Sequence, residues 1–147
     1  MSWMTEMPQR PQRTVYQAIG GHETFHRLVK RFYQGVVDDP LLRPLYPEDD
    51  LDGAEERLRM FLEQYWGGPK TYSEQRGHPR LRMRHAPFAV TREGADRWLV
   101  HMRAALDELE LAPEYAQQLW EYFVYAAQFM INTEDEGDVP SERNLLS

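Results

Sequence analysis

The spacing of the apolar residues constrains the fold of this chain most strongly. Along one segment they recur every three or four positions, at Phe25, Leu28, Val29, Phe32, Val36 and Val37. Such spacing places them on one side of an α-helix, where they can be buried against a core. The same spacing recurs over residues 54–66, 98–109 and 115–130. Residues 80–85 alternate as a strand would, but no second alternating segment is present to pair with them. The sequence therefore predicts an all-α fold.

The two ends of the chain differ from its middle. Residues 1–13 and 133–147 are polar, contain proline and offer few apolar side chains to bury. We therefore expect one compact domain over residues 14–132. It is flanked by a mobile N-terminal extension at 1–13 and an acidic mobile tail at 133–147.

Composition excludes several classes of function. The 147 residues include no cysteine, which excludes disulfides, thiolate metal sites and iron–sulfur clusters. A formal charge of -7 makes non-specific binding to nucleic acid or anionic membranes unfavourable. The most apolar stretch, residues 123–131, is far shorter than a membrane span, and residues 1–8 lack the pattern of a secretory signal. These features predict a cytoplasmic protein without a membrane span.

A long segment, residues 67–87, carries glycines and prolines but no sustained helical spacing. Connections of this length in compact domains usually have a function or are mobile. Its basic and histidine side chains, with no acidic residue after Glu74, are Arg76, His78, Arg80, Arg82, Arg84 and His85. The pattern fits a site for a small dianionic ligand, and equally a solvated basic loop.

His22, Glu23 and His26 match the pattern H-E-x-x-H, in which two histidines one helical turn apart bind zinc and the glutamate activates water. Catalytic zinc needs a third protein ligand, but Val29 and Phe32 stand where the extended pattern has glycine and histidine. A small zinc hydrolase is therefore one alternative, and two exposed histidines at a helix start are another. A helical interaction module that folds without a cofactor is a third.

Several segments together carry a more specific resemblance. They are RFY at 31–33, LYPEDD at 45–50, AEERLRMF at 54–61, YWGGP at 65–69, GHPRLRMRHAPF at 77–88 and Trp98. These segments resemble the group II truncated haemoglobins, without obvious gaps from about Tyr16 to Phe129. The resemblance implies a two-on-two helical sandwich around one haem b, with the glycine pairs at 20–21 and 67–68 as hinges.

The resemblance also implies roles for individual residues. His85 corresponds to the proximal ligand of the haem iron. Arg84 and Arg57 are placed to pair with the haem propionates, which would supply the anion for the basic segment.

On the opposite face of the haem, Tyr33, Tyr46 and Trp98 match the polar residues that contact the bound ligand. Ala54 stands where many globins have a distal histidine. Leu58 and Phe61 follow it one and two turns later as pocket residues.

The implied function is the binding of dioxygen, carbon monoxide, nitric oxide or other small ligands at a penta-coordinate iron. Hydroxyl and indole donors aimed at the ligand slow its release, so we expect ligand scavenging or redox chemistry with nitric oxide or peroxide rather than bulk oxygen transport. Such turnover, as a nitric oxide dioxygenase or a peroxidase, requires a reductase that the sequence does not identify. An oxygen carrier or sensor without turnover is the alternative. Homo-oligomers occur in the family.

Overall fold

The computed structural model describes residues 13–46, 49–80 and 90–133. All regular elements within these ranges are helical, so the all-α prediction is confirmed. The elements are α2 (Val15–Ala18), α3 (Gly21–Val37), the 3-10 helix η1 (Arg43–Leu45), α4 (Leu51–Tyr65), α5 (Thr71–Arg76), α7 (Arg92–Glu108) and α8 (Pro113–Phe129). None of these helices is long and apolar enough to cross a membrane.

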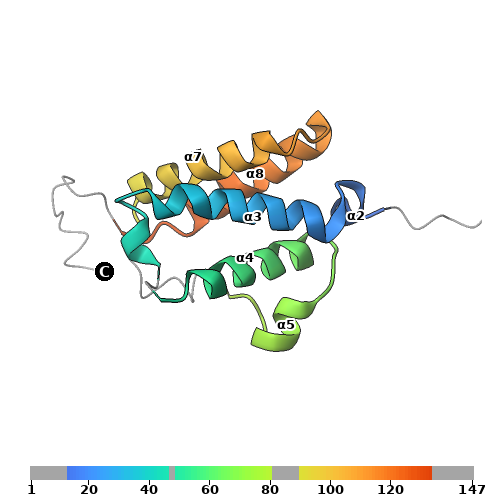
Figure 1. Ribbon diagram of the computed structural model, residues 1–147, viewed down its shortest axis with the longest axis horizontal. Coiled ribbons are helices and arrows are strands. Elements are labelled where there is room, and N and C mark those ends of the chain that lie inside the picture. The colour runs from blue at the N-terminus through green and yellow to red at the C-terminus, as the bar shows by residue number, and fades with distance from the viewer. Residues whose placement is uncertain (1–12, 47–48, 81–89, 134–147) are drawn as a thin grey trace, which may run out of the picture.

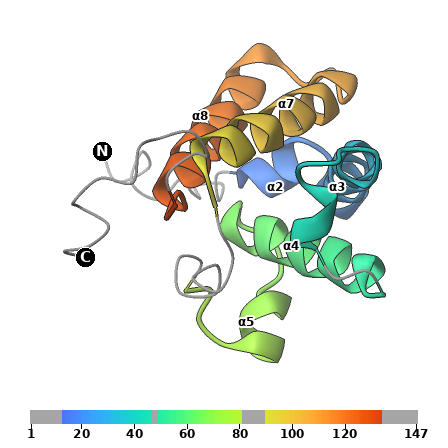
Figure 2. The same ribbon diagram turned by 90° about the vertical axis from the view of Figure 1, so that its left-hand side faces the viewer.

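The four long helices form two pairs. Helix α3 packs against α4 on one side and against α7 on the other, while α7 lies along α8 (Figure 1). Viewed from the end, α7 and α8 form one pair, and α3 and α4 form the other (Figure 2). The amphipathic spacing explains this packing, because each helix turns its apolar side toward its neighbours.

The core follows the predicted helical sides closely. Phe25, Leu28, Val29, Phe32 and Val36 of α3 are fully buried. They pack in one cluster with side chains of the other long helices, among them Leu62, Met102, Leu106, Leu119 and Phe123. Val37 is the exception, because it lies at the last residue of α3 and is 48% exposed.

The predicted glycine hinges lie where the backbone needs them. Gly20 precedes α3 with a φ of 116°, and Gly67 follows α4 with a φ of 95°, both in the left-handed region that favours glycine. A side chain on Gly68 would lie 2.8 Å from the backbone oxygen of Glu63 and 2.7 Å from the ring of Tyr16. The glycines therefore let α2 lie directly against the end of α4.

A buried carboxylate fixes the far end of α3 to α7. Asp39 is 2% exposed and accepts hydrogen bonds from the backbone N–H groups of Leu41, at 2.9 Å, and Leu42. Its Oδ2 lies 2.6 Å from His101 Nε2 and 3.1 Å from Arg97 Nε. Burial opposes the charge on Asp39, but the hydrogen bonds to His101 and to the backbone, together with Arg97, hold its pKa below the ordinary value.

Some predictions fall on residues that the structure does not describe. The terminal extensions lie outside the described residues, except for residues 13 and 133, and so does most of the strand-like segment at 80–85. His85 and Arg84 lie there as well.

Candidate functional site

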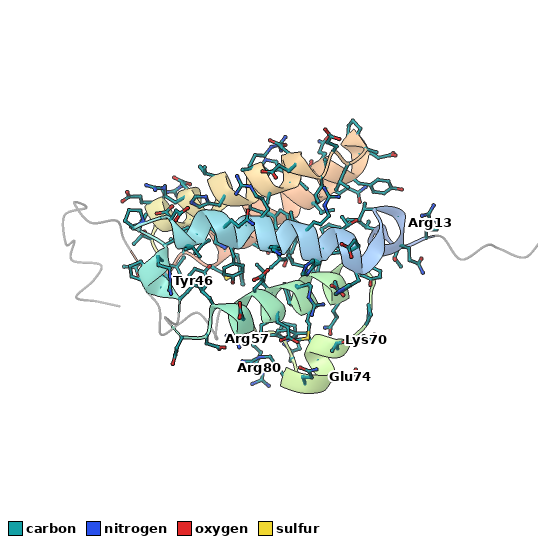
Figure 3. The ribbon with its side chains drawn as sticks, viewed as in Figure 1. Arg13, Tyr46, Arg57, Lys70, Glu74 and Arg80 are labelled. Carbon is teal, nitrogen blue, oxygen red and sulfur yellow. The ribbon has the colours of Figure 1, made fainter. Side chains whose placement is uncertain are left out.

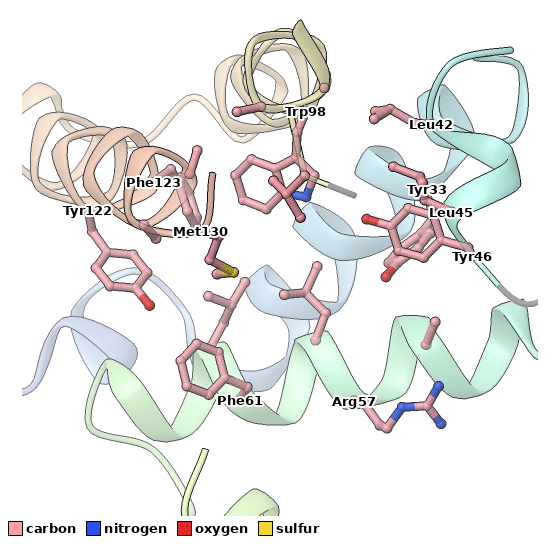
Figure 4. Close-up of a pocket in the computed structure, with 18 of the residues that line it drawn as sticks. Tyr33, Leu42, Leu45, Tyr46, Arg57, Phe61, Trp98, Tyr122, Phe123 and Met130 are labelled. Carbon is pink, nitrogen blue, oxygen red and sulfur yellow. The ribbon is translucent and has the colours of Figure 1, made fainter. Parts of the chain in front are cut away.

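A cavity of about 440 Å³ lies between α4 and the pair formed by α7 and α8 (Figure 4). Its apolar walls include Leu45, Leu58, Phe61, Phe123, Ala126 and Met130. This volume is within the usual range for cofactor and ligand pockets, and mostly apolar walls with a few convergent polar groups are typical of them. The cavity is therefore the candidate site.

The polar groups gather at one end of the cavity. Tyr33 comes from α3, Tyr46 follows η1 and Trp98 comes from α7. The rings of Tyr33 and Tyr46 meet edge to face with their centroids 5.4 Å apart, and the Trp98 indole nitrogen points toward them (Figure 4). The structure thus brings together the three residues that the sequence assigned to one polar group.

These close contacts influence the pKa values of the two tyrosines. Burial is the main cause that raises the pKa of Tyr46 to about 12, while its polar contacts with Trp98 and Tyr33 lower it. Burial, then the nearby Tyr46, raises the pKa of Tyr33. The indole N–H of Trp98 can only donate.

All three side chains can donate a hydrogen bond. Each phenol carries one O–H and the indole carries one N–H. Both phenols are neutral at physiological pH, because the ordinary pKa of tyrosine lies well above that pH and burial raises it. This end of the cavity can hence donate a hydrogen bond to a small ligand.

Helix α4 forms one wall of the cavity with residues one turn apart. Ala54, Leu58 and Phe61, which the resemblance assigned to the haem pocket, all line this cavity. The small side chain of Ala54 adds no polar atom to this wall.

A positive charge lies at the edge of the cavity. Arg57 is on α4 and also lines the cavity, but its guanidinium points to the outer side of that helix (Figure 3). It forms an ion pair with Asp50, with 3.2 Å between Nη1 and Oδ2. Arg76, at the end of α5, lines the cavity too. An anionic group reaching out of the cavity would meet these two side chains.

Comparison with known proteins gives a consistent result. A family model described as bacterial-like globin matches residues 14–132. The group 2 truncated hemoglobin YjbI of Bacillus subtilis is 42% identical over 123 residues, which cover 84% of this chain and 92% of the relative. The chain belongs to the group II truncated haemoglobins.

Solved structures agree with the globin assignment. A thermostable hemoglobin from the actinobacterium Thermobifida fusca is 63% identical, with a TM-score of 0.81 over 88% of this chain and 100% of that chain. A truncated oxygen-avid haemoglobin from Bacillus subtilis is 41% identical, with a TM-score of 0.76 over 82% of this chain and 100% of that chain. The two-on-two fold expected from the sequence is therefore confirmed.

As a globin of this family, the protein binds haem b and, through it, dioxygen. The residues around the cavity fit this cofactor. Apolar walls suit the macrocycle, arginines at the edge suit its two carboxylates, and neutral donors at one end suit a small ligand.

Several residues that line the cavity were not assigned to the site from the sequence. Among them are Tyr72, Arg76, Tyr122 and Met130. In the sequence, Tyr122 belongs to the apolar side of the fourth predicted helix and Arg76 to the basic segment. Neither pattern showed that the residue lines the site. Burial, then the neighbouring Tyr65, raises the pKa of Tyr122, which keeps its phenol neutral in the globin.

The histidines of the H-E-x-x-H pattern are not part of this cavity. His22, Glu23 and His26 are all exposed at the start of α3. Among the described residues, no three histidine, aspartate or glutamate side chains are grouped to hold a metal ion. The zinc hydrolase alternative therefore has no third ligand in this part of the globin.

Proposed function

We propose that this globin retains small diatomic ligands through the donors Tyr46, Tyr33 and Trp98. The single observation that carries the proposal is the group of three hydrogen-bond donors at one end of a mostly apolar cavity. Haem b, when bound, supplies the iron that binds the ligand and also supplies the electrons for redox chemistry. Dioxygen draws electron density when it binds, so a fixed donor in a dry site stabilises it.

Retention can be expressed as a release rate. One hydrogen bond contributes about 1 kcal/mol, and about 1.4 kcal/mol corresponds to a factor of ten. Two or three donors would slow the release of oxygen by roughly one to two orders of magnitude. Slow release is unsuited to bulk transport. It suits ligand scavenging, or redox chemistry with nitric oxide or peroxide.

The remaining assignments extend the proposal to the cofactor. His85 is the proximal iron ligand, and Arg57 and Arg84 pair with the propionates. The position of Arg57 at the edge of the cavity supports its part in this arrangement. Arg57 would exchange its partner Asp50 for a propionate when haem binds.

The experiment replaces Tyr33, Tyr46 and Trp98 together by phenylalanine. Oxygen release from the haem-loaded variant, measured by stopped flow, should be roughly ten to a hundred times faster than from the wild type. An unchanged rate would remove the basis of the proposal. A carrier or sensor would show the same acceleration, so steady-state nitric oxide or peroxide consumption with a reductant must be measured as well. Turnover by the wild type supports an enzyme, and its absence supports a carrier or sensor.

Turnover in the cell would require a partner protein and a shared compartment. Turnover needs a reductase that returns the iron to the ferrous state, and we place both proteins in the cytoplasm. We keep the boundaries of one globin domain at residues 14–132 with an extension on each side. Self-association, as in other members of the family, would be measured by sedimentation of the haem-loaded protein.

A further inference from the structure

The two exposed histidines at the start of α3 form a pair. His22 and His26 lie one helical turn apart, with ring centroids 6.0 Å apart and ring planes inclined by 28°. The pair is at the end of the bundle where α2 meets α4, remote from η1 and Tyr46 (Figure 1). It is therefore separate from the haem cavity.

A buried carboxylate from another helix supports one member of the pair. Glu63, near the end of α4, has a side chain only 6% exposed, and its Oε2 lies 3.0 Å from Nδ1 of His22. A carboxylate can only accept, so the Nδ1 of His22 carries the hydrogen of this bond. Nη1 of Arg59 donates to the same oxygen at 2.9 Å and neutralises the buried charge. It also lies 3.3 Å from Nδ1 of His22, which is longer than the contact of either side chain with Glu63.

This hydrogen bond fixes how His22 presents its ring. With Nδ1 as the donor, the lone pair of the neutral imidazole is on Nε2, on a side chain that is 57% exposed. Within the described part of the chain, neither His22 nor His26 forms a hydrogen bond through Nε2. The pair thus offers two imidazole nitrogens to solvent from one side of a helix.

We propose that His22 and His26 bind a divalent transition-metal ion of the class of Zn²⁺, Ni²⁺ or Cu²⁺. Two histidines at i and i+4 on one helix can share such an ion, and imidazole is a preferred ligand of these metals. A ligating histidine usually donates its other ring N–H to a carboxylate, which is the position of Glu63. Because the described residues offer no third protein ligand, water completes the coordination.

The proposed site has two protein ligands, whereas a zinc hydrolase needs three. It also links two helices. Glu63 is 41 positions from His22 in the chain, so a metal that fixes His22 also strengthens the contact between α3 and α4. Zn²⁺ bound only by the folded globin should therefore raise its unfolding temperature in proportion to the logarithm of the metal concentration.

The test is calorimetric titration of Zn²⁺ into the full-length, haem-loaded globin without an affinity tag. One ion should bind per chain, and His26→Gln should lose at least about tenfold in affinity. Glu63→Gln should lose about tenfold or more through its effect on His22. His78→Gln, at another exposed histidine, should bind like the wild type.

A second readout identifies the ligand atoms. In the diamagnetic ferrous carbon monoxide form, imidazole nitrogen NMR should show Zn²⁺ shifting Nε2 of His22 while its Nδ1 keeps the hydrogen. Equal Zn²⁺ affinity of His26→Gln and the wild type would overturn the site, and His26→Gln is a surface change that should not impair folding. A Zn²⁺-induced shift at Nδ1 in place of Nε2 would overturn the role of Glu63.

Discussion

The proposed donors predict that each tyrosine at the polar end of the cavity slows the release of oxygen. Tyr46→Phe keeps the ring and its edge-to-face contact with Tyr33 but removes one hydroxyl donor. Loss of one donor of about 1–1.5 kcal/mol should accelerate release by roughly 5–12-fold. Tyr33→Phe removes the other hydroxyl and should accelerate release over the same range, about 5–12-fold.

The double variant sharpens this prediction. The rings of Tyr33 and Tyr46 are in contact, with centroids 5.4 Å apart. The effects of residues in contact are usually not additive, so the release rate of the double variant should differ from the product of the two single effects.

Stopped-flow replacement of oxygen by excess carbon monoxide measures all four release rates. Tyr125→Phe, at a tyrosine that is 65% exposed on α8, is the matched control and should leave the rate unchanged. Unchanged release rates in both single variants would refute the assignment of the two hydroxyls as donors to the ligand.

Three further predictions concern stability and the cofactor. Asp39→Asn should lower the free energy of unfolding by about 2 kcal/mol, because His101 and two backbone N–H groups lose a charged, buried acceptor. Folding lowers the pKa of Asp39, so its contribution to the free energy of unfolding is present above about pH 4 and is lost as the pH falls toward the folded pKa. Urea unfolding at several pH values should show this loss in the wild type but not in the variant. Gly68→Ala should cost about 1–3 kcal/mol in urea unfolding, because its Cβ would lie 2.8 Å from the backbone oxygen of Glu63, and an unchanged midpoint would contradict this packing. His85→Gly should change the ferric and ferrous carbon monoxide absorption spectra, whereas wild-type spectra would show that another residue ligates the iron.

The helices and the family could be predicted from the sequence because both depend on short-range patterns. Apolar residues every three or four positions define a buried side whatever the helix packs against, and the buried residues of α3 follow this rule from Phe25 to Val36. The spacing wrongly placed Val37 on the buried side, because the pattern does not show where the helix ends. The motifs around Tyr33, Tyr46 and Trp98 likewise indicated one polar group, although each residue was weak evidence alone.

Tertiary structure decided which distant residues meet. Tyr46, which follows η1, lies against Tyr33 of α3 and lines the cavity together with Trp98 of α7. His22 meets Glu63 across 41 positions.

Asp39 meets His101 across 62 positions. Periodicity fixes which side of a helix is buried but not its partner or its rotation against that partner, so no local pattern in the sequence could show these contacts. The sequence by itself thus determined the helices, the family and the residue types of the site, and packing determined which of these residues meet.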